Sequence, residues 1–171
     1  MTTMTPSLDF VRRKIAYHHW AADKAMDGVA NLTPQQLDAP LGGSFGTGRA
    51  LLNHVIGVEQ LWIDRLRTKQ TGPVPSYPAT HAGADLRNEW HKIRDDQKHF
   101  VDQLTEATYK KPFTWTNLKG EVTTAPISEV FEHIVNHGTY HRGQVTHLLR
   151  DRGVPGPQTD YLIYMKQNPL S

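Results

Sequence analysis

The chain has 171 residues, of which 37% are hydrophobic, and this is enough to bury one sizeable core. No shift in composition marks a second core, so we expect a single domain over residues 1–171. The 19 basic and 17 acidic residues are interspersed and leave a net charge of +2, which argues against a nucleic-acid-binding surface. The sequence contains no cysteine, which excludes disulfides, thiolate ligands to a metal and a cysteine nucleophile.

The sequence also argues against association with a membrane. No apolar run approaches the roughly 20 residues of a membrane span, and the polar start of the chain lacks the apolar region of a signal peptide. We therefore expect a cytoplasmic protein without a membrane partner.

The first amphipathic segment predicts a long helix that runs to about Ala30. Thr5 is placed to cap this helix, and Pro6 to occupy its first helical position. Directly after it, Thr33 and Gln36 have the spacing of a capping box, which indicates a short capped turn.

Two further long helices are expected in the middle of the chain. A glycine-rich loop at 41–48 leads into a helix from about 48 to 69, and it lacks the lysine of a phosphate-binding loop. Residues 71–83 contain three prolines and indicate a crossover. The third helix, about 84–107, has an apolar stripe that Gln97 interrupts.

The last third of the chain predicts a hairpin followed by the longest helix. Residues 113–116 alternate in polarity and could pair with 121–124 across a turn. Pro126 then opens the fourth long helix, and 159–166 could form a short terminal helix. The fold class is therefore all-α, a four-helix bundle with a small β-hairpin before the fourth long helix and a short C-terminal helix. The sequence pattern alone does not choose the order of the helices.

The fourth helix carries two histidines where a helix normally buries leucines. His137 and His141 lie one turn apart in the apolar stripe that contains Ile134 and Val145. Two imidazoles with this spacing on an inward face are typical of a metal site. His54, in the stripe of the second long helix, supplies a candidate third ligand.

The alternative is that these are core histidines that hydrogen-bond to neighbours. Three separately buried histidines would each need a polar partner, so the metal site is the stronger hypothesis. His18 and His19 border the stripe of the first helix, and either could replace His54 as the third ligand.

Two further histidines of the fourth helix are not expected to be ligands. His133 lies at the edge of the stripe, beside the site or on the surface, and His147 should be solvated. His133 and His137 have the spacing of a zinc protease motif, but Ile134 stands where the catalytic glutamate would be, which argues against a metalloprotease. Arg142 follows a candidate ligand and could orient an anionic substrate, although a surface or interface salt bridge is favoured.

Several strings of residues resemble the DinB/YfiT-like family of metal-dependent enzymes over essentially the whole chain. They are Leu52-Asn-His54 with Glu59 and Leu61-Trp62, and above all the string from His133 to Gln144. The resemblance implies an up-down-down-up four-helix bundle, often dimeric, with a divalent metal held by His54, His137 and His141. It also implies kinship with thiol-dependent S-transferases and a thiol-dependent isomerase.

Three neutral imidazoles and an open position suit zinc or nickel as the cofactor. The first functional hypothesis is a metal-dependent transferase or isomerase that acts on a small-molecule substrate with a low-molecular-weight thiol. The second is hydrolysis by a metal-bound hydroxide, which the absence of a glutamate beside the ligands weakens. The third is a non-catalytic metal-binding or stress-response protein. We expect a homodimer in each case.

Overall fold

The computed structural model describes residues 6–69 and 72–170, and this part of the chain is mostly helical with one antiparallel hairpin. Both features agree with the prediction. The elements are α1 (Leu8–Val29), α2 (Pro34–Asp38), α3 (Gly48–Thr68), α4 (Gly83–Asp102), α5 (Glu106–Tyr109), β1 (Pro112–Thr116), β2 (Val122–Pro126), α6 (Ile127–Asp151) and α7 (Tyr161–Gln167).

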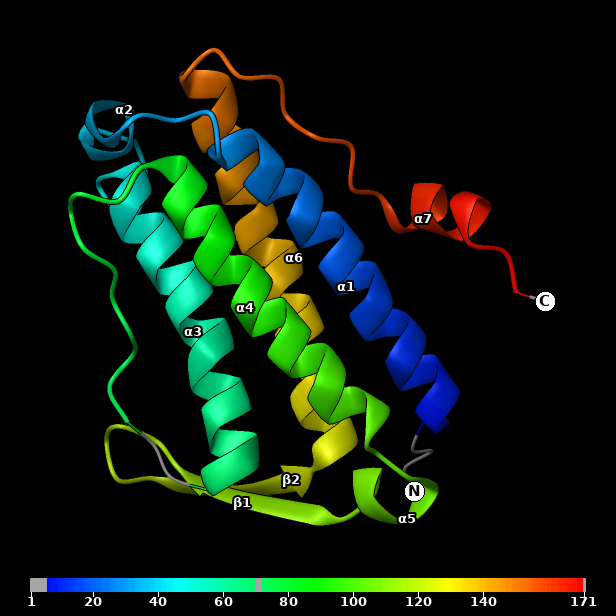
Figure 1. Cartoon of the computed structure of the whole chain (residues 1–171). Helices are drawn as coiled ribbons and strands as arrows, with labels where there is room; N and C mark the ends of the chain where they lie inside the picture. The colour runs from blue at the N-terminus through cyan, green and yellow to red at the C-terminus, as the bar shows by residue number, and fades with distance from the viewer. Residues whose placement is uncertain (1–5, 70–71, 171) are drawn as a thin grey trace.

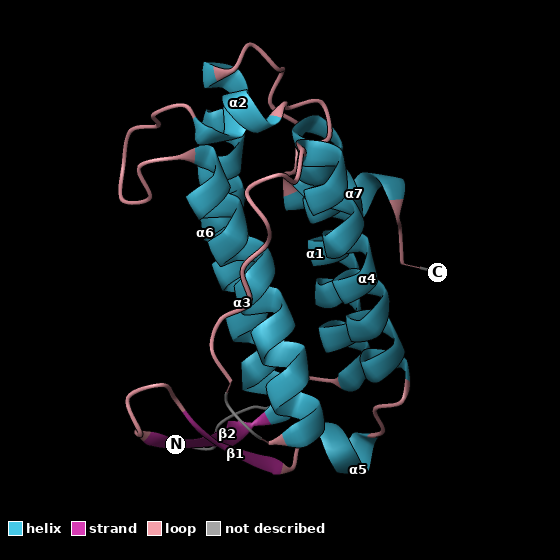
Figure 2. Ribbon diagram, turned by 60° about the vertical axis from the view of Figure 1, so that its left-hand side comes forward, coloured by secondary structure: helices cyan, strands magenta, loops and turns pink. Residues whose placement is uncertain are grey.

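The four long helices lie side by side (Figure 1). Helix α1 packs against α4 and α6, and α3 packs against the same two helices. Turning the molecule shows α3 beside α6, with the hairpin at one end of this pair (Figure 2). None of the helices in the described residues is both long and apolar enough to cross a membrane.

The core consists of two apolar clusters, one near each end of the helices. The cluster towards the hairpin includes Ile15, Trp62 and Phe131, and the other includes Ile56 and Leu148. Between them lies a polar layer, which we define as the buried side chains of His18, His19, Glu59, Gln97 and Arg142. Each of the four long helices contributes to this layer, so it crosses the whole protein between the clusters.

Helix α1 begins two residues later than the capping pattern predicts. Ser7 is the N-cap and accepts a hydrogen bond from the backbone N–H of Phe10, and the helix starts at Leu8. Pro6 therefore precedes the helix, and its carbonyl accepts a hydrogen bond from the Tyr109 hydroxyl. Thr5, the predicted cap, lies outside the described residues.

Helix α4 ends at Asp102, five residues before the predicted end, because the chain starts a new helix there. Leu104 is buried in the cluster near the hairpin, and Thr105 becomes the N-cap of α5. The N–H of Thr105 donates to Thr108 Oγ1 at 2.8 Å. Glu106, in the first turn of α5, accepts from the N–H of Leu8, so the two helix starts are joined.

The hairpin and the terminal helix follow the prediction closely. Strands β1 and β2 pair antiparallel with Phe113 opposite Ala125 and Thr116 opposite Val122. Helix α6 begins at Ile127 directly after β2, and α7 begins at Tyr161. The capping box at Thr33 is also present.

The glycine-rich segment before α3 is a compact loop, here named the entry loop (residues 41–47). Its base is closed by a bridge between Pro40 and Thr47 and by a hydrogen bond from the Leu41 N–H to the Gly46 carbonyl. Gly43 and Gly46 have φ values of 93° and 74°, a conformation that favours glycine. Thr47 then caps α3, as a helix-entry loop requires.

Candidate metal centre

Three histidines from two helices meet at one point between α3 and α6. The Nε2 atom of His54 lies 3.2 Å from that of His141 and 3.3 Å from that of His137. The candidate ligand atoms of these three residues, which we call the triad, all lie within 4.8 Å of one another. His141 is buried, and His54 and His137 are half-buried. The structure thus brings together the three residues that periodicity and the family resemblance single out.

The spacing of the nitrogens fits a metal ion. A zinc–nitrogen bond of about 2.05 Å in a tetrahedral site places two ligand nitrogens about 3.3 Å apart. The two Nε2–Nε2 distances from His54 match this value. The residues present therefore could hold a divalent cation without rearrangement of the helices.

Gln144 fixes the orientation of one ligand. Its Oε1 lies 2.6 Å from Nδ1 of His141, so Nδ1 carries the proton and Nε2 presents a lone pair to the centre of the triad. The two residues are three apart on α6 and so share a face. Sequence reasoning did not assign this role to Gln144, although the spacing was a usable signal.

Burial favours the neutral, metal-binding form of two members of the triad, His54 and His137. Desolvation, with a smaller contribution from His141, lowers the pKa of His137 to about 4. The same two causes lower the pKa of His54. Both imidazoles are therefore neutral at pH 7 and need not lose a proton before coordination.

Phe45 and Tyr140 both contact the triad. The Phe45 ring, in the entry loop, lies 5.1 Å from the His54 ring and 5.8 Å from the His141 ring, between centroids. The Tyr140 ring, on α6, lies 4.9 Å from His141. Phe45 was missed because a loop has no periodicity that would indicate where its side chains point.

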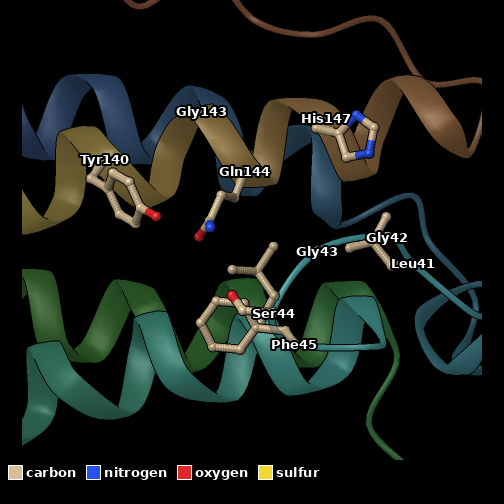
Figure 3. A pocket seen from close by; sticks show the side chains of 10 residues that line it. Leu41, Gly42, Gly43, Ser44, Phe45, Tyr140, Gly143, Gln144 and His147 are labelled. Carbon is tan, nitrogen blue, oxygen red and sulfur yellow. The ribbon is translucent and has the colours of Figure 1, made fainter.

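A pocket of about 450 Å³ lies between the entry loop and α6 (Figure 3), and three of its lining residues, Phe45, Tyr140 and Gln144, contact the triad. We call it the loop-side pocket. Its walls include Leu41, Phe45, Leu51, Tyr140 and Gln144. The volume falls in the usual range for small-molecule sites.

The remaining histidines of α6, His133 and His147, do not join the triad. His133 is exposed, and its ring lies 5.8 Å from that of His137 and 5.1 Å from Trp62. This agrees with its predicted place beside the site. His147 is exposed, as predicted, and lies at the edge of the loop-side pocket.

His18 and His19 both point inward but belong to the polar layer instead of the triad. Nε2 of His18 lies 3.2 Å from Oε1 of Glu59, and Nε2 of His19 lies 3.0 Å from Oε1 of Gln97. Gln97 in turn donates to Oε2 of Glu59 at 2.7 Å. The interruption that Gln97 makes in the stripe of α4 thus has a structural cause, since this side chain is buried against two polar partners.

Glu59 is the fully buried charge of the polar layer. Burial alone would raise its pKa, but His18 and the hydrogen bond from Gln97 outweigh this effect and hold the pKa below its usual range. A cavity of about 20 Å³ lies beside His18, Glu59 and Arg142, and each of these has one buried polar atom without a protein hydrogen bond. The volume and these three polar atoms in an otherwise mostly apolar lining suit one water molecule.

The prediction of a surface or interface salt bridge for Arg142 is wrong. Its side chain is buried, with 5% of the residue exposed, because α6 packs closely against α1 at this level. The guanidinium donates to the Tyr17 hydroxyl at 3.1 Å and to Thr139 Oγ1 at 2.8 Å. It also lies 3.3 Å from Nδ1 of His18. The close approach is possible because Gly138, one turn earlier, has no side chain in front of His18.

Three comparisons with known proteins agree on one family. The chain matches the DinB family over residues 4–169. It is 24% identical over 162 residues to Protein DinB of Bacillus subtilis (strain 168), a match that covers 92% of this chain and 94% of that protein. It also resembles the crystal structure of a DinB-like protein from Bacillus cereus ATCC 10987, with a TM-score of 0.72 at 19% identity. That match covers 91% of this chain and 99% of the other. Because the family match spans nearly the whole sequence, this protein belongs to the DinB family.

Proposed function

We propose that this protein is a divalent-metal-dependent transferase or isomerase that acts on a small molecule with a low-molecular-weight thiol. The observation that carries the proposal is the convergence of His54, His137 and His141, whose candidate ligand atoms all lie within 4.8 Å of one another, with the two Nε2–Nε2 distances from His54 at tetrahedral spacing. Zinc or nickel suits three imidazole ligands.

The chemistry that a bound cation would supply is Lewis acidity, which lowers the pKa of a coordinated thiol and so makes a nucleophile at neutral pH. The chain supplies no thiol of its own because it has no cysteine. His141, held by Gln144, keeps its lone pair directed at the centre, and the loop-side pocket offers space for a substrate beside it.

The surroundings of the triad favour thiol chemistry over hydrolysis. Among the described residues, the group of candidate ligands contains histidines alone and no carboxylate that could shuttle a proton from water. Glu59 does not fill this role, because it is fully buried in the polar layer against His18 and Gln97. The size of the loop-side pocket also favours an enzyme over a purely metal-storing protein.

The first test is metal binding by single variants. We expect His54→Ala, His137→Ala and His141→Ala each to lose stoichiometric zinc or nickel, because each removes one of three protein ligands. His147→Ala is the matched control on the same helix, since this side chain is exposed and outside the triad. The metal content of untagged protein is the measurement, and metal retained by any of the three variants contradicts the ligand set.

The second test is activity. Metal-loaded protein is assayed with electrophilic substrates in the presence and absence of glutathione, bacillithiol or mycothiol, with His137→Ala as the blank. Turnover that requires the thiol supports the proposal. Thiol-independent ester or amide hydrolysis that disappears in the variant would instead identify a hydrolase, and turnover in neither condition favours a non-catalytic role.

We further propose that the four long helices form a single-domain up-down-down-up bundle. Two observations support this: each long helix packs against two others, and the colours of Figure 1 run upward in α1 and α6 and downward in α3 and α4. Dimerisation stays a prediction, which light scattering of the purified protein would test.

A further inference from the structure

The loop-side pocket lacks charged walls. Among the described residues that line it, none is Asp, Glu, Lys or Arg. Leu41 and Leu51 are buried beneath it, and Phe45 covers one side. The imidazole of His147 lies at the exposed edge of the pocket. A charged group placed against Leu41, Leu51 and Phe45 would lose water without gaining a carboxylate, lysine or arginine partner, which is costly. The pocket therefore favours an uncharged, largely apolar group.

Two aromatic rings frame the side of this pocket nearest the triad. Figure 3 shows Tyr140 on α6 and Phe45 in the entry loop on opposite walls, with Gln144 between them. Tyr140 is 68% exposed although its ring contacts His141. A large aromatic side chain left uncovered beside candidate ligands is well placed to pack against a bound molecule.

A second hollow, of about 380 Å³, lies on the other side of the triad and differs in charge. We call it the hairpin-side hollow. It is lined by Trp62, Arg65, Trp115, Glu129 and His133, among others, so ionic groups do belong to its walls. It approaches the triad through the contact between the rings of His133 and His137. A charged part of a ligand is accommodated better here than in the loop-side pocket.

We propose that the loop-side pocket binds the uncharged, largely apolar part of the substrate, with Phe45 and Tyr140 setting the size of group that is accepted. This inference rests on the proposed metal-dependent function and names the substrate class for it: aryl or alkyl compounds without charge on the part nearest the triad.

The test uses two thiols that differ by one para carboxylate, benzyl mercaptan and 4-(mercaptomethyl)benzoate. Each is titrated into cobalt-loaded protein, and binding is followed by the thiolate-to-cobalt charge-transfer absorption. We expect benzyl mercaptan to bind at least about tenfold more tightly, because the carboxylate would be buried without a partner. Equal affinity for the two thiols overturns the proposal.

A matched pair of variants shows which pocket holds the aromatic ring of the bound thiol. Ser44 is exposed at the rim of the loop-side pocket, and Glu129 is exposed at the hairpin-side hollow. Ser44→Arg should bring the affinity ratio of the two thiols close to one, by giving the carboxylate a cation, while Glu129→Arg should leave the ratio as in the wild type. The reverse pattern places the ring in the hairpin-side hollow and refutes the proposal.

A metal-free measurement separates the pocket from the metal chemistry. Benzyl alcohol is titrated into the apoprotein, and the side-chain NMR signals of Phe45 and Tyr140 are followed. Shifts in both rings support the pocket even if no thiolate absorption develops with cobalt, a result that would count against the thiol-dependent function alone. Unchanged signals in both rings refute the pocket proposal.

Discussion

The hydrogen bond between Gln144 and His141 should govern metal affinity, although Gln144 is not itself a candidate ligand. At 2.6 Å between Oε1 and Nδ1 it is a short bond to a buried imidazole. It selects the tautomer that presents Nε2 and holds the ring in one orientation. Loss of such a bracing partner typically weakens metal binding about 10–100-fold, which corresponds to about 1.4–2.7 kcal/mol.

Gln144→Met tests this magnitude, because methionine keeps the length of the side chain and lacks the carboxamide oxygen. The zinc dissociation constant is measured by competition with a chromophoric chelator on untagged apoprotein. We expect Gln144→Met to raise the zinc dissociation constant about 10–100-fold. Gln144→Glu should bind zinc at least as tightly as the wild type, since a carboxylate accepts the same proton more strongly.

The control is His147→Ala, one turn further along α6 and exposed. Its zinc affinity should be unchanged, and circular dichroism should show equal helical content for all three variants. Wild-type zinc affinity in Gln144→Met, alongside lost binding in His141→Ala, would refute the argument that Gln144 positions the ligand.

Two further predictions concern stability. The melting temperature of the apoprotein should fall as the pH drops from about 6.5 to about 4, because the pKa values of His19 and His137 are lowered from 6.5 to about 4 in the fold and the unfolded chain therefore binds more protons in this window. His137→Gln should reduce the slope of melting temperature against pH. An undiminished slope in the variant would contradict the contribution of His137 to this pH dependence. Gly138→Ala should destabilise the protein by about 1–3 kcal/mol in chemical unfolding, since the new Cβ would lie 2.3 Å from Cε1 of the buried His18. Gly143→Ala on the same helix meets no atom within 4 Å and should instead be neutral or stabilising, so equal effects of the two substitutions would contradict this reasoning.

Helical periodicity singled out the three histidines that the structure brings together, because all three lie on regular elements. His137 and His141 occupy positions of an apolar stripe, and His54 does so on a second helix. The inward direction of each side chain could therefore be deduced from the spacing. Their meeting point could not be deduced in the same way, because it depends on how α3 and α6 are placed relative to each other. The family resemblance supplied that information.

The polar layer shows where periodicity fails. The same pattern that marks His54 as inward also marks Gln97 as an interruption, and hydrophobicity alone cannot tell a buried polar residue with partners from an exposed one. Arg142 was misjudged for this reason, since its partners Tyr17 and His18 come from a helix more than a hundred residues earlier. The end of α4 was misplaced because Thr105, which starts a new helix, lies within a sequence that continues the helical pattern.

The backbone just before the entry loop is held by a side chain from more than a hundred residues later in the sequence. Arg152, just beyond α6, donates to the carbonyls of Gln36, Ala39 and Pro40 at 2.8–3.0 Å, and Thr47 closes the other side of the loop. The residues between these anchors, 42–46, are exposed apart from the half-buried Phe45 and contribute little to either apolar cluster. Sequence changes in this short stretch can therefore alter one wall of the loop-side pocket while the helices that position the triad keep their packing. For protein engineering, this makes Gly42, Ser44 and Phe45 the natural positions for a focused library in which ligand preference is varied, while Gly43 and Gly46 are kept because their positive φ values favour glycine.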